Sequence, residues 1–311
     1  MTESAPTTSL FITGASGYLG HSLLRRLARG PARAITCLSR HPEQTAADVP
    51  RQPGWQFVKG DLTDPASYRA ALADAHTVIH LAAATGKERP AVFARVNIEG
   101  TRDLVENAAH AGTARMIYVS SIAAKFPDRR HYPYAESKLE AEEIVKSVAP
   151  AWAIVRPTLV FGAHSPVLRG LIKLVKGPIG VVFGSGQVQV QPIDVDDVAN
   201  ILAETIDRAT WDGEVVEAGG PSVLGFDDLL HRIRERLRGR QGGLFHVPLG
   251  PLRTLVAAVE PVLLPLLPIG AGQLAAFAND STADRHPLVD HYRPHMKTID
   301  TMLDVIQQSD D

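Results

Sequence analysis

The chain has 311 residues, more than a single hydrophobic core usually organises, so we expect one large domain and a smaller lobe. Hydrophobic residues make up 45% and charged residues 21%, as in ordinary globular proteins. The net charge of −2 and the lack of a long basic run argue against a nucleic-acid partner, because phosphate binding requires clustered lysine and arginine. The single cysteine, Cys37, excludes an internal disulfide and fits a reducing, cytoplasmic location.

No segment has the pattern of a secretory signal or of an integral membrane span. Residues 1–9 are polar and lack an apolar core. The most apolar stretch, residues 255–269, is too short to span a bilayer and holds Glu260 and three prolines. We interpret it as a helix pair that lines a pocket or an interface, with contact to a membrane surface as the alternative.

In the first half of the chain, short apolar runs alternate with longer helical patterns. This alternation is typical of βαβ units and predicts a parallel sheet with helices on both faces. The expected strands are residues 9–13, 33–38, 56–58, 77–80, 115–120 and 152–155. The expected helices are residues 18–29, 65–73, 90–111 and 132–148.

After residue 157 glycine and proline become frequent, and helices are expected at 166–176 and 226–238. The acidic residues of 193–199 favour the first turn of a helix, and a strand at 214–218 is expected to return to the sheet edge. We therefore predict a doubly wound sheet domain of residues 1–156 plus about 191–219. A smaller, mostly helical lobe of residues 157–190 plus 220–311 would bind the substrate.

A glycine-rich turn joins the first expected strand to the first helix. Gly14 allows a tight turn, Gly17 lets the backbone approach a pyrophosphate, and Gly20 permits close packing of helix on strand. The N–H groups at the start of the helix would face the anion. In this position the motif predicts a Rossmann-type dinucleotide site that also involves Ser16, Tyr18 and Leu19.

The residues just past the second strand decide between NAD and NADP. An acidic side chain there would bind the ribose hydroxyls of NAD, but this chain has Ser39 and Arg40. Because a guanidinium pairs with a 2′-phosphate, we predict NADP, with NAD as the alternative if Arg40 is only a solvated loop charge. Asp61, after the third strand, could accept a hydrogen bond from the adenine amino group.

Tyr134 and Lys138 are spaced by one helical turn, which places the phenol and the ammonium on one helix face. A phenol titrates near 10, and we expect the neighbouring ammonium to lower the pKa of Tyr134 toward the working range. Ser121 ends the strand that precedes this helix, at the edge where such a sheet binds ligands. The three side chains predict a centre for proton transfer to a substrate oxygen.

Together these motifs resemble the short-chain dehydrogenase/reductase superfamily in its extended, NAD-dependent epimerase/dehydratase-like form. By this resemblance Tyr134 is the general acid/base, Lys138 its partner, Ser121 the group that polarises the carbonyl, and Asn97 a member of the proton relay. The resemblance also implies cofactor contacts from Leu62, Leu81, Ala82, Ala83, Ser120 and Pro157. The matching segments are residues 13–20, 61–64, 80–83, 96–101, 118–121, 134–138, 156–157 and 194–199.

Residues 156–162 and 191–197 are similar to an atypical subgroup related to a nucleotide-binding accessory subunit of respiratory complex I. Several members of that subgroup lack the tyrosine/lysine pair, so its presence here favours catalysis. Sugar-nucleotide dehydratases of the superfamily carry Thr-Asp-Glu after the catalytic strand. This chain has Ser121-Ile122-Ala123 there, which argues against dehydration.

We predict an NADP(H)-dependent oxidoreductase that interconverts a ketone or aldehyde and an alcohol on a small molecule. Residues 244–278 are rich in leucine, valine and proline, which favours a hydrophobic substrate. The alternatives are a nucleotide-sugar epimerase with tightly bound NAD and a non-catalytic NADP-binding assembly or sensor protein. The resemblance further implies a homodimer through the helices at 90–111 and 132–148.

Four histidines require a separate interpretation. His80 ends a strand, and we interpret it as a hydrogen-bonded structural residue. His286, His291 and His295 lie close together in the sequence, but their spacing imposes no tetrahedral ligation, so we predict no metal site.

Overall fold

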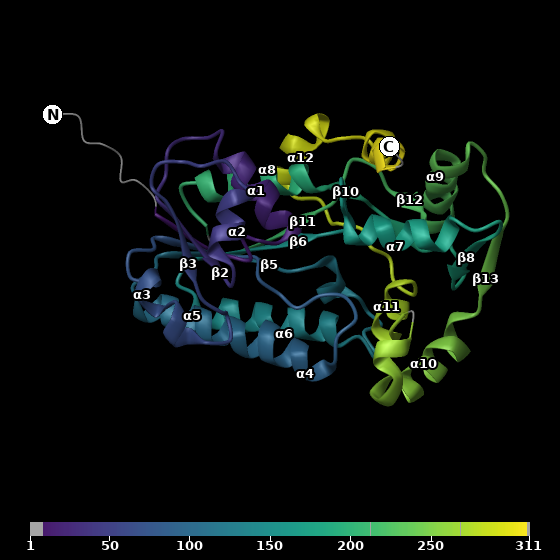
Figure 1. Cartoon of the computed structure of the whole chain (residues 1–311), viewed down its shortest axis with the longest axis horizontal. Coiled ribbons are helices and arrows are strands. Elements are labelled where there is room, and N and C mark those ends of the chain that lie inside the picture. Colours follow the sequence, from purple (N-terminus) through teal and green to yellow (C-terminus); the bar gives the residue numbers. More distant parts are fainter. Residues whose placement is uncertain (1–8, 212, 268, 310–311) are drawn as a thin grey trace.

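The protein is described by a computed structural model that covers residues 9–211, 213–267 and 269–309. The polar segment 1–8, in which we found no secretory signal, lies outside the described residues. A seven-stranded parallel sheet forms the centre, in the order β11-β6-β5-β4-β1-β2-β3 (Figure 1). Its strands are β1 (Leu10–Thr13), β2 (Ile35–Ser39), β3 (Trp55–Lys59), β4 (Thr77–His80), β5 (Arg115–Val119), β6 (Trp152–Pro157) and β11 (Glu214–Ala218).

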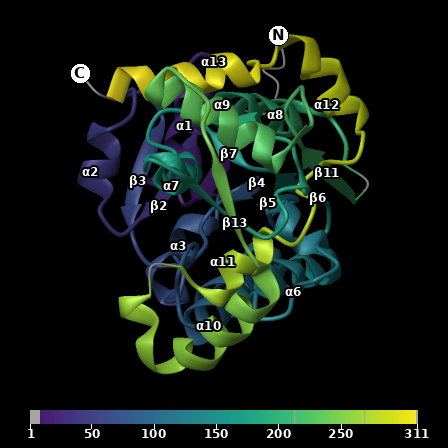
Figure 2. The same cartoon turned by 90° about the vertical axis from the view of Figure 1, so that its right-hand side faces the viewer.

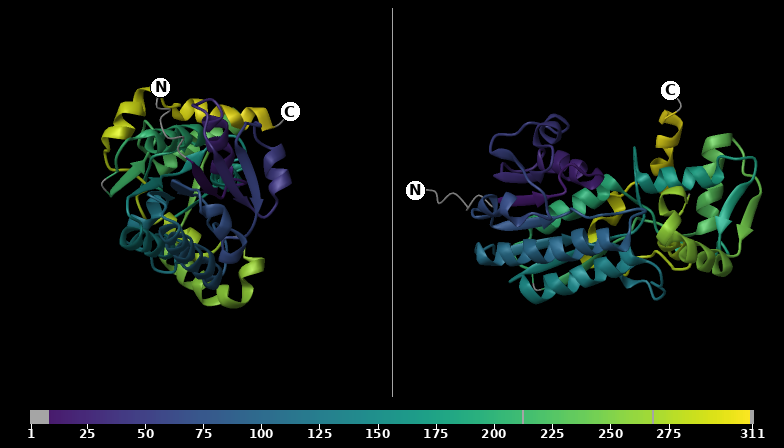
Figure 3. Two further views of the ribbon diagram at one scale, coloured as in Figure 1. Left: turned by 90° about the vertical axis from the view of Figure 1, so that its left-hand side faces the viewer. Right: turned by 60° about the horizontal axis from the view of Figure 1, so that its bottom comes forward.

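Helices cover both faces of this sheet, so its central strands are apolar and buried on both sides (Figure 3). One face carries α1 (Tyr18–Leu27) and α8 (Val195–Asp207). The other carries α3 (Arg69–Leu72), α5 (Gly100–His110) and α6 (Pro133–Val148). The predicted Rossmann-type α/β fold is thereby confirmed, including the return of residues 214–218 to the sheet edge beside β6.

Two of the expected helices differ from the prediction. The helix expected at 90–111 is divided into α4 (Pro90–Phe93), a π-helical segment η2 (Ala94–Glu99) and α5. The segment expected at 65–73 is a 3₁₀ turn (Pro65–Ser67) followed by α3. A short helix α2 (Pro42–Ala47) was not predicted. Because π-helical turns are rare and occur often at functional sites, the position of η2 directs attention to its buried residue, Asn97.

The smaller lobe is built from helices and three short strand pairs (Figure 2). Its helices are α7 (Pro166–Val175), α9 (Phe226–Arg238), α10 (Leu249–Leu263), α11 (Ala271–Ala276) and α13 (Ile299–Leu303). The strand pairs are β7 (Val160–Phe161) with β10 (Ile193–Asp194), β8 (Gly180–Phe183) with β13 (Leu244–Val247), and β9 (Gln189–Val190) with β12 (Leu224–Gly225).

The apolar stretch at 255–269 forms most of α10 and the 3₁₀ turn that follows it. Four of its side chains are exposed, those of Leu255, Val262 and Leu263 in α10 and of Leu266 in the 3₁₀ turn, whereas Val256 is buried against α11. Within the described part of the chain, no helix has the length and apolar character needed to cross a bilayer.

The C-terminal segment does not stay in the lobe. After α11 the chain returns to the sheet domain, where Val289 of α12 (Pro287–Tyr292) and Met296 join the core beneath α1 and α8. Helix α13 then packs back onto the lobe through Met302 and Leu303. The predicted division, which assigned residues 220–311 to the lobe as one block, therefore does not follow the packing of residues 287–296.

Candidate active site

At two of the three glycines in the turn between β1 and α1, the neighbouring backbone leaves no room for a Cβ atom. Gly14 has φ +73°, and a Cβ there would lie 2.5 Å from the amide nitrogen of Ala82. A Cβ on Gly20 would lie 2.2 Å from the Gly14 carbonyl oxygen. A Cβ on Gly17 would meet only the same oxygen, at 3.1 Å, so packing alone does not demand a glycine there.

The N-terminus of α1 is open to a ligand. Ser16 and Gly17 are exposed, and no side chain caps the helix. Such free N–H groups bind a phosphate, so the turn fits the pyrophosphate of a dinucleotide. Tyr18 turns away to donate a hydrogen bond to the Phe161 carbonyl (3.1 Å), and Leu19 packs against the core.

The adenosine end of the predicted dinucleotide site lies after β2 and β3. Ser39 is buried, and its hydroxyl accepts from the His41 amide (3.0 Å) and bonds the Thr45 hydroxyl (2.8 Å). Because Thr45 itself donates to the His41 carbonyl, Ser39 must be the donor to Thr45. The one proton of the Ser39 hydroxyl is thus donated within the protein, whereas Arg40 is exposed.

Asp61 faces the same region. The amide of Thr63 donates to it (2.9 Å) and lowers its pKa, an effect to which Arg40 adds. Arg40 therefore lies near enough to Asp61 to act on it electrostatically. Leu62 is buried and packs against Gly100. The structure places the exposed guanidinium and the acid of Asp61 at one edge of the sheet.

A chain of buried hydrogen bonds runs behind the loop that follows β4. Thr101 donates to the Asn97 carbonyl (2.6 Å), so Nε2 of His80 must donate to the Thr101 hydroxyl (2.9 Å). Nδ1 of His80 then accepts from Thr13 (2.7 Å), whose hydroxyl oxygen accepts from the Ala82 amide (3.2 Å). Burial lowers the pKa of His80 to about 3, so the ring is neutral. The structural interpretation of His80 is confirmed, and the network fixes the loop of Leu81, Ala82 and Ala83.

Ser121 and Tyr134 lie close together at the carboxyl end of β5. Ser121 accepts a hydrogen bond from the Ala123 amide (3.2 Å) and thereby caps the 3₁₀ turn η3 (Ile122–Lys125). Tyr134 stands in the first turn of α6, beside the rings of Phe93 and Tyr132. Burial in this ring cluster raises the pKa of Tyr134, while a hydrogen bond with the Ser121 side chain lowers it.

Lys138 follows one turn later on α6 and is 1% exposed. Its Nζ donates to the Val119 carbonyl (2.8 Å) and lies 4.3 Å from the ring centre of Tyr118. Burial lowers the pKa of Lys138 to about 7, and the charge of Glu142 acts in the opposite direction. The pKa of Tyr134 is raised and not lowered as expected, because burial of the phenol has the largest effect on it and the effect in the opposite direction comes from Ser121.

Asn97 is buried in η2 and joins two parts of the site. Its Nδ2 donates to the Ala84 carbonyl (3.1 Å) and to the Ser137 hydroxyl (2.9 Å), and its Oδ1 accepts from the Ala84 amide (2.7 Å). Ser137 in turn donates to the carbonyl of Tyr134 (2.7 Å). Asn97 thus holds the loop after β4 against the first turn of α6. Its part in a proton relay stays a prediction.

Two further predicted residues lie at the ends of β5 and β6. Ser120 is 6% exposed, and its buried hydroxyl has no hydrogen-bond partner among the described residues. Pro157 is buried and pairs in register with Ala218 of β11. A buried hydroxyl without a partner is costly, so Ser120 is consistent with a ligand that completes its hydrogen bonds.

The histidines near the C-terminus are not brought together as ligands. Nδ1 of His286 accepts from the Leu288 amide, its Nε2 lies 3.4 Å from Glu214, and the ring of His295 packs on Tyr292. Among the residues that the structure describes, no group of three metal-ligating side chains forms a site.

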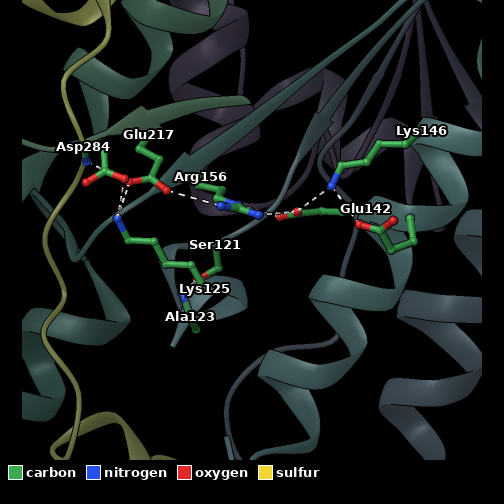
Figure 4. A network of polar contacts seen from close by, with 9 residues as sticks. Ser121, Ala123, Lys125, Glu142, Lys146, Arg156, Glu217 and Asp284 are labelled. Carbon is green, nitrogen blue, oxygen red and sulfur yellow. Dashed lines mark hydrogen bonds and ion pairs between the residues drawn. The ribbon is translucent and has the colours of Figure 1, made fainter. Parts of the chain in front are cut away.

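Two ionic clusters around the site were not predicted from the sequence. In the first, Asp128 connects the loop after Ser121 to the lobe, because Arg253 of α10 donates to both of its carboxylate oxygens (3.0 and 3.2 Å). In the second, Arg156 binds Glu142 and Glu217 behind α6 (Figure 4). The sequence around each residue does draw attention to it, since Arg156 precedes Pro157 and Glu142 follows Lys138 by one helical turn. It does not indicate that the two residues pair with each other.

A phosphate-binding glycine turn and a serine/tyrosine/lysine centre on the same edge of one parallel sheet define a dinucleotide-binding protein of the dehydrogenase/reductase class. Residues 10–219 match the NAD dependent epimerase/dehydratase family, and the chain belongs to that family. The predicted membership of the extended short-chain dehydrogenase/reductase group is thereby confirmed.

The relatives of the chain include enzymes of more than one type. A ceramide reductase from Caulobacter vibrioides is 34% identical over 194 residues, 60% of this chain and 57% of that protein. The chain thus matches less than two thirds of this relative. A dTDP-glucose 4,6-dehydratase from Streptomyces antibioticus is 35% identical over 71% of this chain and 75% of its own length. The solved structure of MoeE5 with UDP-glucuronic acid and NAD superposes with a TM-score of 0.72 at 19% identity, covering 97% of this chain and 99% of MoeE5.

Proposed function

We propose that the chain is an NADP(H)-dependent oxidoreductase that interconverts a ketone or aldehyde and an alcohol on a hydrophobic small molecule. The observation that carries this proposal is the position of Ser121 at the end of β5, near enough to the Tyr134 phenol to lower its pKa, with the buried Lys138 one helical turn beyond Tyr134 on α6. Two hydroxyl groups so placed can share one substrate oxygen, and a cation beside them favours negative charge on it.

The residues proposed to bind the cofactor lie along the predicted dinucleotide site. The turn at Gly14–Gly20 would hold the pyrophosphate, Arg40 the 2′-phosphate, and Lys138 the nicotinamide ribose, with Ala82, Ala83 and Pro157 alongside. When bound, the dinucleotide supplies or accepts the hydride. In the reduction direction Ser121 donates a hydrogen bond to the substrate oxygen and Tyr134 gives that oxygen its proton. The raised pKa of Tyr134 keeps the phenol protonated and ready to donate.

NADP is favoured over NAD by Arg40, which is exposed at the end of β2, where an acid would select NAD. A carboxylate at this point would repel a 2′-phosphate, whereas a guanidinium can pair with it. MoeE5 was solved with NAD, so NAD is the alternative to be tested directly.

The reductase assignment is supported by the relative named ceramide reductase, whose name also points to a lipid-like substrate. The chain has Ser121-Ile122-Ala123 where the dehydratases of the superfamily carry Thr-Asp-Glu, so we do not transfer the activity of the dehydratase relative. A nucleotide-sugar epimerase remains the second candidate, because the chain shares its fold over almost its full length with MoeE5, a protein solved with a nucleotide sugar.

One experiment separates the two candidates. The protein is purified, the nucleotide released by denaturation is identified by chromatography, and absorbance at 340 nm is followed with NADPH or NADH and a panel of long-chain and cyclic ketones. An oxidoreductase consumes NADPH in step with ketone loss. Tightly bound NAD, together with interconversion of UDP-sugars and no net absorbance change, would establish the epimerase instead.

A further inference from the structure

The ammonium of Lys138 lies in the layer between α6 and the sheet, where water cannot solvate it. Lys138 is 1% exposed, and its Nζ donates to the Val119 carbonyl at the end of β5 (2.8 Å). An ammonium has three N–H donors, and this bond is the only hydrogen bond that Nζ makes with the described residues. Because one hydrogen bond offsets only part of the cost of burying a charge, the position of Nζ requires a further contact.

The titratable groups around this ammonium do not supply that contact. Glu142 follows Lys138 by one turn of α6, but Arg156 already binds both of its carboxylate oxygens, at 2.9 and 2.6 Å (Figure 4). Burial lowers the pKa of His80 to about 3 and raises the pKa of Tyr134, so both rings are neutral at pH 7. Within the described part of the chain, no carboxylate lies within ion-pair distance of Lys138.

The second contact of the ammonium is the face of an aromatic ring. Nζ of Lys138 lies over the ring of Tyr118, 4.3 Å from its centre. Tyr118 is the last residue of β5 that pairs in register with β4, opposite His80, and the two rings lie 5.4 Å apart. The face of an aromatic ring carries partial negative charge and attracts a cation, most strongly where water is excluded. Tyr118 is itself 1% exposed, so its ring meets the ammonium under these conditions.

The hydroxyl of Tyr118 has no matching purpose. It is buried, and it has no hydrogen-bond partner among the described residues. A buried hydroxyl without a partner is unfavourable, and phenylalanine would fill the same place in the core without this cost. The position therefore needs the ring and not the hydroxyl.

We propose that Tyr118 is a positioning residue for the active site, whose ring face, together with the Val119 carbonyl, fixes the Lys138 ammonium at the end of β5. Two such contacts restrict the rotation of a flexible lysine side chain, so that its remaining donors stay in place for the nicotinamide ribose. Without the ring, Nζ would keep one hydrogen bond, and the charged form would lose a stabilising contact. The inference rests on the role proposed above for Lys138, but the state of Lys138 can be measured without any turnover.

The test uses the full-length protein carrying ¹³Cε-labelled lysine, with the Lys138 signal assigned by its loss in Lys138→Arg. The titration of this signal is followed by NMR in the wild type, in Tyr118→Leu and in Tyr118→Phe. The matched control is Tyr68→Leu. Tyr68 belongs to the same core, is also 1% exposed and also has an unpaired hydroxyl, but its ring packs on Phe11, with centres 6.3 Å apart. The Kd for NADPH, measured by fluorescence, is the second readout.

We expect Tyr118→Leu to lower the Lys138 titration midpoint by about one unit or more and to raise the Kd for NADPH about tenfold or more, because the charged form loses its contact with the ring. Tyr118→Phe keeps the ring and should match the wild type in both values. Tyr68→Leu should lose stability, as Tyr118→Leu does, but leave the Lys138 midpoint unchanged.

Should Tyr118→Leu fail to fold, Tyr118→Met takes its place, since methionine fills irregular space in a core without supplying a ring. A wild-type midpoint in the folded Leu or Met variant overturns the proposal, and so does an equal fall of the midpoint in Tyr118→Phe or in Tyr68→Leu. An absence of NADPH binding or of ketone reduction by the wild type would refute the proposed function and leave the midpoint result standing.

Discussion

Replacement of Arg253 by leucine should loosen the loop that joins Ser121 to Tyr134. Arg253 is 8% exposed and donates from two nitrogens to Asp128, at 3.0 and 3.2 Å. Asn279 exchanges two more hydrogen bonds with the backbone of Asp128, at 3.1 and 2.9 Å. Asp128 is thus the point at which the smaller lobe holds the loop between Ser121 and Tyr134, and Arg253 is its buried charged partner.

The expected loss in the free energy of unfolding depends on how far Arg253 and Asp128 are exposed to water. Hydrogen bonds to a charged group contribute about 1.5–3 kcal/mol when they are shielded from water. The Asp128 side chain is 26% exposed, so water can solvate the carboxylate after the substitution, and we reduce the expected loss to about 1–2 kcal/mol. Arg130 also pairs with Asp128, but its side chain is 77% exposed, so Arg130→Leu should cost at most about 0.5 kcal/mol.

The assay is urea unfolding of both variants at pH 7 and pH 3. The hydrogen bonds from Arg130 and Arg253 hold the pKa of Asp128 well below its usual range, so the pair stabilises the fold above the ordinary carboxyl pKa and loses this effect as the pH falls. The loss of stability caused by Arg253→Leu should therefore be larger at pH 7 than at pH 3. Equal stability of the two variants at pH 7, or a deficit that grows on acidification, would refute the reasoning.

Three further predictions concern the cofactor turn, the choice of cofactor and a buried acid. Gly20→Ala places a Cβ 2.2 Å from a backbone oxygen and should cost about 1–3 kcal/mol in thermal or urea unfolding, whereas Gly17→Ala should fold normally and weaken NADPH binding at least about tenfold. Arg40→Ala should raise the Kd for NADPH about tenfold to a hundredfold and leave that for NADH within about twofold; equal changes would contradict NADP selection. Burial raises the pKa of Asp197 to about 6, so its ionisation destabilises the fold as the pH rises from about 4 through 6. Asp197→Asn should therefore be more stable than the wild type at pH 8, by on the order of 2 kcal/mol, and not at pH 4; an unchanged or lower stability at pH 8 would contradict this.

The parts of the fold that the sequence predicts are those specified by local pattern. Buried parallel strands are short apolar runs, and an amphipathic helix shows its period over ten or more residues, so β4 and α9 have the predicted bounds. The π-helical segment around Asn97 was missed because one extra residue per turn hardly alters the apolar spacing. The return of Val289 to the sheet domain was missed because it depends on packing between segments far apart in the chain.

The same distinction applies to the active site. Tyr134 and Lys138 are separated by one helical turn, so their arrangement is local and could be predicted. Their protonation is not local, because it depends on the rings packed around the phenol and on the partners of Glu142. The pairing of Arg253 with Asp128 joins residues that are 125 positions apart, which no spacing in the sequence indicates.

The most direct test of the account compares Tyr134→Phe with Tyr132→Phe in the reduction of a ketone by NADPH. The two rings are neighbours in one cluster, with centres 5.9 Å apart, so both variants remove a hydroxyl from the same surroundings. We predict that Tyr134→Phe loses at least about a hundredfold in kcat while its NADPH affinity stays within about twofold, and that Tyr132→Phe retains activity. Turnover by Tyr134→Phe at the wild-type rate would contradict the assignment of Tyr134 as the group that transfers the proton.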